Sequence, residues 1–279
     1  MTRQKSLLAR VRSALGDLHP AERKLGDLLC DFPGELASYS ARELAALAGV
    51  SNATVTRFVR RLGYESYEDA RRHAREESET GSRLYLPPVM EGESADPAAL
   101  QVEQSLRNIQ HTMASIETGT IDAVARAILG ARKAWVIGFR ASHPFASYLH
   151  WQITQVMEAI IAIPGAGQTL GEHLVDVRAE DCVVFFGLRR RVAITDNILS
   201  EVESRGAKVL FLSDEGMPHR ASATWHLRCQ TAAPGPLFNH SSVMVLCHLI
   251  ATRVIELADV AGRDRLRRIE MLNDALSEL

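Results

Sequence analysis

Apolar and polar positions follow two different periods along this chain. In the first 77 residues the apolar positions recur three or four residues apart, as in Leu7, Leu8, Val11, Leu15 and Leu18, which predicts a wholly helical region. From residue 98 onward, short runs rich in β-branched and aromatic residues alternate with helical stretches. The chain is therefore expected to join an all-helical domain to an α/β domain.

The helical region carries strong start and stop signals. Ser40 and Glu43 form the Ser-x-x-Glu pattern of a capping box, in which each side chain satisfies a backbone donor of the other residue. This pattern predicts a short helix over 41–48. Ser51 then caps a further helix that is expected to end at Leu62.

The second region has the alternation of a doubly wound, mostly parallel sheet. Because parallel strands need crossover connections, helices are expected on both faces of that sheet. The predicted strands cover 134–138, 159–163, 182–186, 208–213 and 224–229. The predicted helices cover 98–117, 120–131, 143–158, 192–204, 239–258 and 262–278.

Between the two patterns lies a polar and acidic stretch that contains three prolines at positions 87, 88 and 97. Its composition favours a linker over 78–97, with an ordered surface loop as the alternative. The expected division is thus a helical domain over 1–77, the linker, and an α/β domain over 98–279.

Composition narrows the functional classes. The 279 residues are 46% apolar and 24% charged with a net charge of −2, which is ordinary for a globular protein and excludes a uniformly basic one. Residues 51–75 nevertheless hold six arginines against three acidic residues, a local positive surface that is compatible with nucleic acid. No apolar run is long enough for a transmembrane helix, so no membrane association is expected.

The chemistry-bearing residues give no sign of a cofactor. The four cysteines form no Cys-x-x-Cys pair and stand among apolar neighbours, which favours free thiols in a reducing cytoplasm. The histidines show no ligand spacing, so neither a metal nor another cofactor is expected.

The segment 40–64 has the properties of a DNA-reading helix-turn-helix, although an ordinary αα-hairpin remains the alternative. Its second helix carries small and polar residues at its front, which lets a helix enter the major groove, and arginines further along. An apolar seam between the helices is expected from Leu44, Leu47, Val55, Phe58 and Leu62. The candidate DNA-binding residues are Ser51, Asn52, Ala53, Thr54, Thr56, Arg57, Arg60 and Arg61.

Residues 18–73 resemble the N-terminal domain of RpiR/MurR-type bacterial transcriptional regulators. The matching features are Pro-Ala-Glu-Arg-Lys from residue 20, Phe-Pro at 32–33, and the run SARELAALAGVSNATVTRFVRRLGY from residue 40. The resemblance implies a helix-turn-helix domain joined to a sugar isomerase-type (SIS) domain, a doubly wound fold that binds phosphorylated sugars.

A ligand site is expected where the predicted strands end, because open parallel sheets bind ligands outside the carboxyl ends of their strands. Basic and polar residues follow three of these strands at the starts of helices, where anions bind. The candidate ligand-binding residues are Gly138, Arg140, Ser142, Gly187, Arg189, Arg190, Ser213 and Asp214.

The resemblance also marks a departure in this site. SIS domains place a serine in the first loop, which Ser142 matches, and serine or threonine hydroxyls in the second, where this chain has Gly187, Arg189 and Arg190. Arginines keep an anion site but leave open whether the ligand is a sugar phosphate or a carboxylate. The alternative is that these arginines are surface salt-bridge partners.

These observations favour a cytoplasmic, ligand-responsive transcriptional regulator. It would bind a palindromic double-stranded operator as a homodimer or homotetramer and sense a small anionic metabolite. Helices 239–258 and 98–117 are the candidate subunit interfaces. One alternative is a sugar-phosphate aldose–ketose isomerase with an accessory domain, for which Glu172, His173 and His240 are the candidate acid/base groups. The other is an oligomerisation module without ligand.

Overall fold

The structure of the chain is a computed structural model that describes residues 7–31, 36, 39–79, 96–189, 191–234 and 237–278. The chain divides into two units. The first comprises Met1–Asn108 together with Thr231–Asn239, and the second comprises Ile109–Gln230 together with His240–Leu279. Most of the expected linker lies outside the described residues, so the expected domain boundaries remain a prediction.

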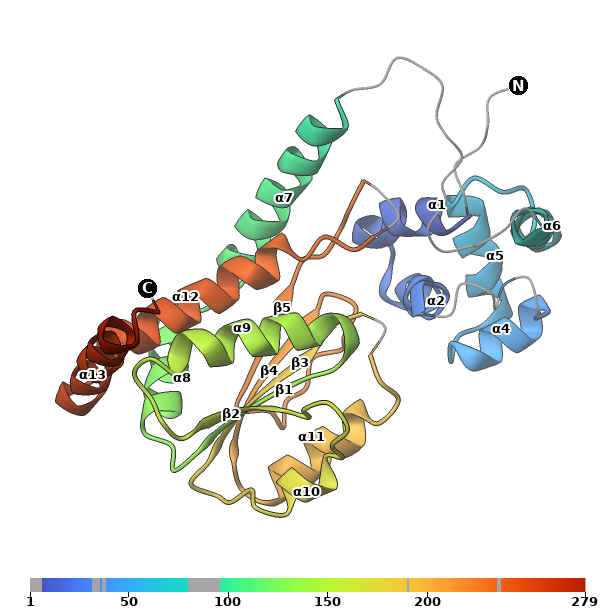
Figure 1. Cartoon of the computed structure of the whole chain (residues 1–279). Coiled ribbons are helices and arrows are strands. Elements are labelled where there is room, and N and C mark those ends of the chain that lie inside the picture. Colours follow the sequence, from blue (N-terminus) through green and yellow to red (C-terminus); the bar gives the residue numbers. More distant parts are fainter. Residues whose placement is uncertain are drawn as a thin grey trace. The chain divides into compact units, whose positions relative to one another are not determined.

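The described elements of the first unit are helices (Figure 1). The capping box is present as expected: the Ser40 hydroxyl accepts the Glu43 N–H at 3.3 Å, and the Glu43 carboxylate accepts the Ser40 N–H at 2.8 Å. The elements are α1 (Leu7–Ala14), the 3-10 turn η1 (Leu15–Asp17), α2 (Pro20–Asp31), α4 (Ala41–Leu47), α5 (Asn52–Arg61), α6 (Tyr67–Glu79) and the beginning of α7 (Pro97–Ala114).

A hydrophobic core holds these helices together. Four of the five expected seam residues, Leu44, Val55, Phe58 and Leu62, are buried in it. The fifth expectation, Leu47, is wrong, because this side chain is 54% exposed. On the short α4 the buried face runs through 44, 45 and 48, and at 100° per residue position 47 falls on its flank.

The first unit also contains a segment from much later in the chain. Phe238 packs against the helical core, and the guanidinium carbon of Arg12 lies 4.7 Å from the centre of its ring. The Asn108 amide donates to the Ala232 carbonyl at 2.8 Å, which ties the same segment to α7. Local sequence patterns give no signal for this long-range packing.

The second unit contains a five-stranded parallel sheet, as expected, in the order β2-β1-β3-β4-β5. Its strands are β1 (Ala134–Gly138), β2 (Ile160–Ile163), β3 (Cys182–Gly187), β4 (Lys208–Asp214) and β5 (Trp225–Cys229). In this order the chain winds outward in both directions from β1 and β3, so the crevice between their carboxyl ends is the switch point where ligands bind in such sheets.

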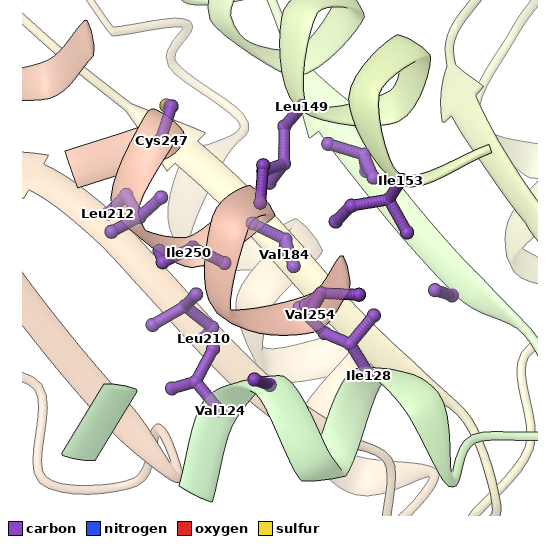
Figure 2. Close-up of a cluster of buried hydrophobic side chains, with 14 of the residues drawn as sticks. Val124, Ile128, Leu149, Ile153, Val184, Leu210, Leu212, Cys247, Ile250 and Val254 are labelled. Atoms are coloured by element: carbon purple, nitrogen blue, oxygen red, sulfur yellow. The ribbon is translucent and has the colours of Figure 1, made fainter. Parts of the chain in front are cut away.

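Helices cover both faces of the sheet (Figure 1). One face packs against α8 (Thr120–Leu129), α9 (His143–Ile153) and α12 (Ser241–Leu257). Figure 2 shows Ile250 and Val254 of α12 between α8, α9 and the strand residue Val184. The opposite face packs against α10 (Gly171–Leu174) and α11 (Thr195–Ser204), and α13 (Val260–Leu276) follows α12.

Two predicted helix boundaries in this region need correction, and one helix was not predicted. The helix expected over 143–158 ends at Ile153, and the carbonyl of Thr154 beyond it accepts a hydrogen bond from Arg265 of α13 at 2.9 Å. The helix expected from 192 begins at Thr195, after a loop in which Arg191 contacts Asp214. The short α10 carries no periodic signal and was not predicted. No described helix is long and apolar enough to cross a membrane.

Candidate DNA-binding helix and ligand site

The helix α5 has one buried face and one free face. Ser51 caps it by accepting the Thr54 N–H at 3.2 Å, and its inward side, with Val55, Phe58 and Val59, is buried in the core. The outward side carries residues at successive helical turns. These exposed or half-exposed residues are Asn52, Ala53, Thr56, Arg57, Arg60 and Arg61.

Thr54 differs from the other candidate DNA-binding residues, because its side chain is buried. Its hydroxyl lies 2.9 Å from the Ser51 hydroxyl and accepts a hydrogen bond from Arg57 Nη2 at 3.3 Å. Thr54 thus links the cap of α5 to the exposed Arg57 one turn later, which restricts where that guanidinium can lie.

Arg61 is held by a residue that sequence reasoning missed. Its Nε lies 3.0 Å from Glu22 Oε2, a carboxylate that is almost wholly buried at the start of α2. Glu22 also accepts the His19 N–H at 3.4 Å. An open cavity of about 600 Å³ lies here, between α2 and α5, and it is lined by His19, Ala21, Glu22, Arg57, Arg60 and Arg61.

The expected ligand residues gather at the carboxyl ends of β1, β3 and β4. Ser142 is buried in the 3-10 turn η2 (Arg140–Ser142), and its hydroxyl accepts the Leu188 N–H at 3.2 Å. This bond joins the loop after β1 to the loop after β3. A Cβ at Gly138 would lie 2.7 Å from the Ser142 carbonyl oxygen, so only glycine permits the close approach of β1 to this turn.

Two arginines from the β3 loop converge on one carboxylate. Arg189 Nε lies 3.5 Å from Asp214 Oδ1, and both side chains are fully buried. Arg191 Nη1 donates to Asp214 Oδ2, and the Gly216 N–H donates to Oδ1 at 2.8 Å. Two guanidinium groups thus lie beside one carboxylate at the carboxyl ends of β3 and β4, and guanidinium groups are suited to binding an anion.

The Ser213 hydroxyl forms contacts within the fold. Its hydroxyl donates to the Asp214 carbonyl at 3.0 Å and lies 2.8 Å from His226 Nε2. His226 Nδ1 accepts the Arg220 N–H at 3.0 Å, so the neutral ring carries its proton on Nε2 and donates to Ser213. Burial lowers the pKa of His226 to about 4.

His240 borders the same site from the start of α12. Its ring lies edge-on to Phe145 with centroids 5.6 Å apart. Burial lowers its pKa, which the negative charge of Asp214 partly opposes. Its Nε2 atom is buried and has no hydrogen-bond partner among the described residues.

The remaining candidate ligand-binding residues are Arg140, Gly187 and Arg190. Arg140 is exposed and has a φ of 51°, a left-handed conformation that is uncommon outside glycine and that occurs at ligand sites. Gly187 ends β3, where a Cβ would lie 2.6 Å from the Phe211 ring. Arg190 lies outside the described residues. The structure adds Arg191 and His226 to the candidate ligand site. The sequence contains no signal for them, because the residues they contact are distant along the chain.

Glu172 and His173 are placed away from these contacts, on the short α10 that follows β2. Glu172 accepts a hydrogen bond from Thr169 at 3.2 Å, and His173 Nε2 lies 3.0 Å from the Gln168 amide oxygen. Among the described residues there is no group of three or more His, Cys, Asp or Glu that could hold a metal ion.

Comparison with protein families agrees with the two-part fold. The model of the helix-turn-helix domain of the rpiR family matches residues 5–80, and the SIS domain model matches residues 127–253. A DNA-reading helical domain joined to a doubly wound SIS domain defines a transcriptional regulator. These matches confirm the resemblance found in residues 18–73, since the chain combines a helix-turn-helix domain of the rpiR family with a SIS domain.

Individual relatives have the same organisation. The HTH-type transcriptional regulator HexR of Pseudomonas aeruginosa is 22% identical over 273 residues, which cover 95% of both chains. The NanR protein of Vibrio vulnificus, solved in complex with ManNAc-6P, matches with a TM-score of 0.56 and 18% identity over 97% of this chain and 99% of that one.

The sugar isomerase domain of an RpiR transcription factor from Sphaerobacter thermophilus has a TM-score of 0.57 and 19% identity, and the match covers 64% of this chain and 99% of that one. At these identities the structural likeness establishes the fold, which confirms the predicted combination of a helical domain and a doubly wound domain.

Proposed function

We propose that this regulator inserts α5 into the major groove of its operator and that a small anionic metabolite, such as a phosphosugar, changes its affinity for that DNA. The observation that carries the DNA-binding assignment is the two-sided character of α5. Its core face is buried, while its free face begins with small and polar residues and ends with arginines.

The residues on the free face of α5 are proposed to contact different parts of the DNA. Asn52 and Arg57 have the donors and acceptors to read base edges, and Thr54 positions Arg57. Arg60 and Arg61 lie further along the helix, where contacts to phosphates anchor it. Ser51, Ala53 and Thr56 complete the surface that faces DNA.

For the effector, an anion at the β1–β3 switch point is supported by the guanidinium groups of Arg189 and Arg191 beside Asp214. It is also supported by His240 Nε2, which has no hydrogen-bond partner among the described residues. Ser142 and Gly138 shape the turn beside it, and Asp214 and Ser213 hold the arginines and His226 in place. The NanR relative was solved with a phosphorylated sugar, which favours that ligand class here as well.

We further propose that the chain acts in the cytoplasm as a homodimer or homotetramer on a palindromic operator, because two-fold DNA sites require two-fold proteins. The helices α7 and α12 are candidate interfaces, since each exposes large apolar side chains. These are Leu100, Val102 and Leu106 on α7, and Met244, Val245 and Leu249 on α12.

We also propose that the chain binds its effector without converting it. Of the three acid/base candidates, Glu172 and His173 on α10 form hydrogen bonds with Thr169 and Gln168, and only His240 borders the proposed anion site. A discontinuous assay of aldose–ketose interconversion with the full chain tests this point. Turnover of a hexose or pentose phosphate would support the isomerase alternative.

The DNA-binding proposal is tested by selecting duplexes from a random pool with the full-length chain. The selected sequences are expected to share a two-fold motif, and the Asn52→Ala/Arg57→Ala variant is expected to enrich none. Arg205→Ala, which removes an arginine at the end of α11, is the matched control and should enrich the same motif. If both variants enrich the wild-type motif, α5 is not the reading helix.

A further inference from the structure

The printed contacts of the C-terminal helix α13 with the rest of the second unit lie near its beginning, while Ile269 and Asn273 further along are half-buried. Asp259 caps it by accepting the Gly262 N–H at 3.1 Å, and Arg265 Nε donates to the Thr154 carbonyl at 2.9 Å. Gly262 is the only residue of this helix that is buried. Figure 1 shows the helix at the periphery of the second unit, beyond the end of α12.

The charges of α13 are segregated along its length. Its first half carries Arg263, Arg265, Arg267 and Arg268 against Asp264, and its second half carries Glu270 and Asp274 with no basic residue. The helix dipole favours the opposite distribution, with acidic residues in the first turn and basic residues in the last. The observed distribution is therefore unfavourable for an isolated helix.

Four of these charges form one stripe. At 100° per residue, Arg263, Arg267, Glu270 and Asp274 fall within about 60° of one another around the helix axis. Within the stripe, 263 and 267 are like charges four residues apart, and so are 270 and 274, an arrangement that is unfavourable in a single helix. No ion pair to Arg263, Glu270 or Asp274 is found among the described residues.

The stripe is complementary to itself in the antiparallel direction. Arg263 and Asp274 lie at equal distances of about 8 Å on either side of the midpoint of the stripe, and Arg267 and Glu270 lie symmetrically inside them. A two-fold axis through that midpoint places Arg263 opposite the partner's Asp274 and Arg267 opposite the partner's Glu270. The exposed apolar side chains of Val260 and Met271 border the stripe and would be covered in the same contact.

We propose that α13 is a self-recognition surface that pairs antiparallel with α13 of a second copy of this chain. An isologous contact of this kind closes after two subunits, so it forms a dimer and not a filament. The interface uses α13 in addition to α7 and α12, and it stands on the charge pattern of α13 alone, independent of whether the chain binds DNA.

Charge reversal tests the pairing directly. The full-length wild type, Arg263→Glu/Arg267→Glu, Glu270→Arg/Asp274→Arg and the variant with all four changes are compared by sedimentation equilibrium. Each double variant makes the stripe uniform in sign, so its self-association should weaken at least about tenfold. The variant with all four changes restores complementarity and should recover wild-type association to within about threefold.

Mixing the two double variants provides a second, independent readout, because one stripe is then wholly acidic and the other wholly basic. A heterodimer is expected, and it should weaken as salt is raised from about 0.05 M to about 0.5 M. Circular dichroism and the thermal unfolding of each variant separate loss of pairing from loss of folding.

Association that is unchanged in both double variants, or a wild type that is monomeric throughout, would overturn the pairing. So would a failure of both the mixture and the variant with all four changes to recover association while the helical content is retained.

Discussion

Arg57 and Arg60 lie three residues apart on α5 and have different tasks in the proposed complex. Arg57 is held by Thr54 in position to read a base, whereas Arg60 is exposed and suited to a phosphate. Arg57→Ala should therefore reduce discrimination at one base pair by about 1–3 kcal/mol. Arg60→Ala should weaken every duplex equally and lower the salt slope by about one unit.

These two effects are separated by measuring fluorescence anisotropy on the selected operator and its single-base variants at several salt concentrations. A loss in Arg57→Ala that is uniform over all duplexes would show that Arg57 contacts the backbone instead.

The titration of His226 should make the stability of the second unit depend on pH. Its folded-state pKa of about 4 lies below the ordinary value of 6.5, so between these values the unfolded chain binds more protons. The stabilisation is fully present above about pH 6.5 and is lost as the pH falls toward 4.

Thermal midpoints of the wild type and His226→Gln over pH 4 to 7 check this expectation. The wild type should lose stability more steeply than the variant as the pH falls. Parallel curves would show that the neutral ring contributes nothing to the pH dependence.

For individual residues, the sequence predicts only contacts between residues that are close along the chain. The capping box of Ser40 and Glu43 could be predicted, because its two residues are three positions apart. The partners Glu22 for Arg61 and Asp214 for Arg191 could not be predicted, because folding alone brings them together.

Among the elements, α2 and α5 are tied by the pair between Glu22 and Arg61. Arg61→Gln should destabilise the first unit by about 1 kcal/mol, since it leaves a buried carboxylate without its cation at a partly exposed site. It should also change the salt slope of DNA binding less than Arg60→Gln does, because Glu22 already neutralises Arg61.

The matched variant Arg60→Gln should leave the stability of the first unit unchanged. Chemical denaturation and salt titration of both variants decide the point. Equal stability with an equal fall in salt slope would mean that Glu22 does not hold Arg61 in solution.

Helices and strands with a clear apolar period could be predicted from the sequence. Short elements, and ends that depend on contacts distant along the chain, could not. The buried strand β3 and the amphipathic α5 were found within one residue at either end, because each has a clear period and clear stops. The end of α9 was missed, and the Thr154 carbonyl just beyond it accepts a hydrogen bond from Arg265, which lies more than 100 residues away in sequence.

For the whole molecule, the two periodicities were enough to predict a helical part and a parallel α/β part. They could not show that the segment Thr231–Asn239 belongs to the first unit, since Phe238 meets Arg12 and the helical core only after folding. Phe238→Ala should lower the unfolding free energy of the first unit by about 1–3 kcal/mol.

The neighbouring Leu237→Ala is the control, because that side chain is 61% exposed and should change little. Denaturation monitored in the first unit measures both variants. Equal stability of the two would show that this contact does not contribute to the fold.

The central claim is that one molecule joins a DNA-reading helix to an anion site whose occupation changes DNA affinity, which requires unequal effector binding to two states. The most direct measurement is operator affinity against the concentration of a panel of hexose phosphates and their unphosphorylated sugars, for the wild type and Arg191→Gln. At least one phosphorylated sugar should change wild-type affinity tenfold or more, its free sugar should not, and Arg191→Gln should shift the midpoint at least about tenfold. Operator affinity that no phosphorylated sugar alters, or a midpoint unchanged in Arg191→Gln, would contradict the account.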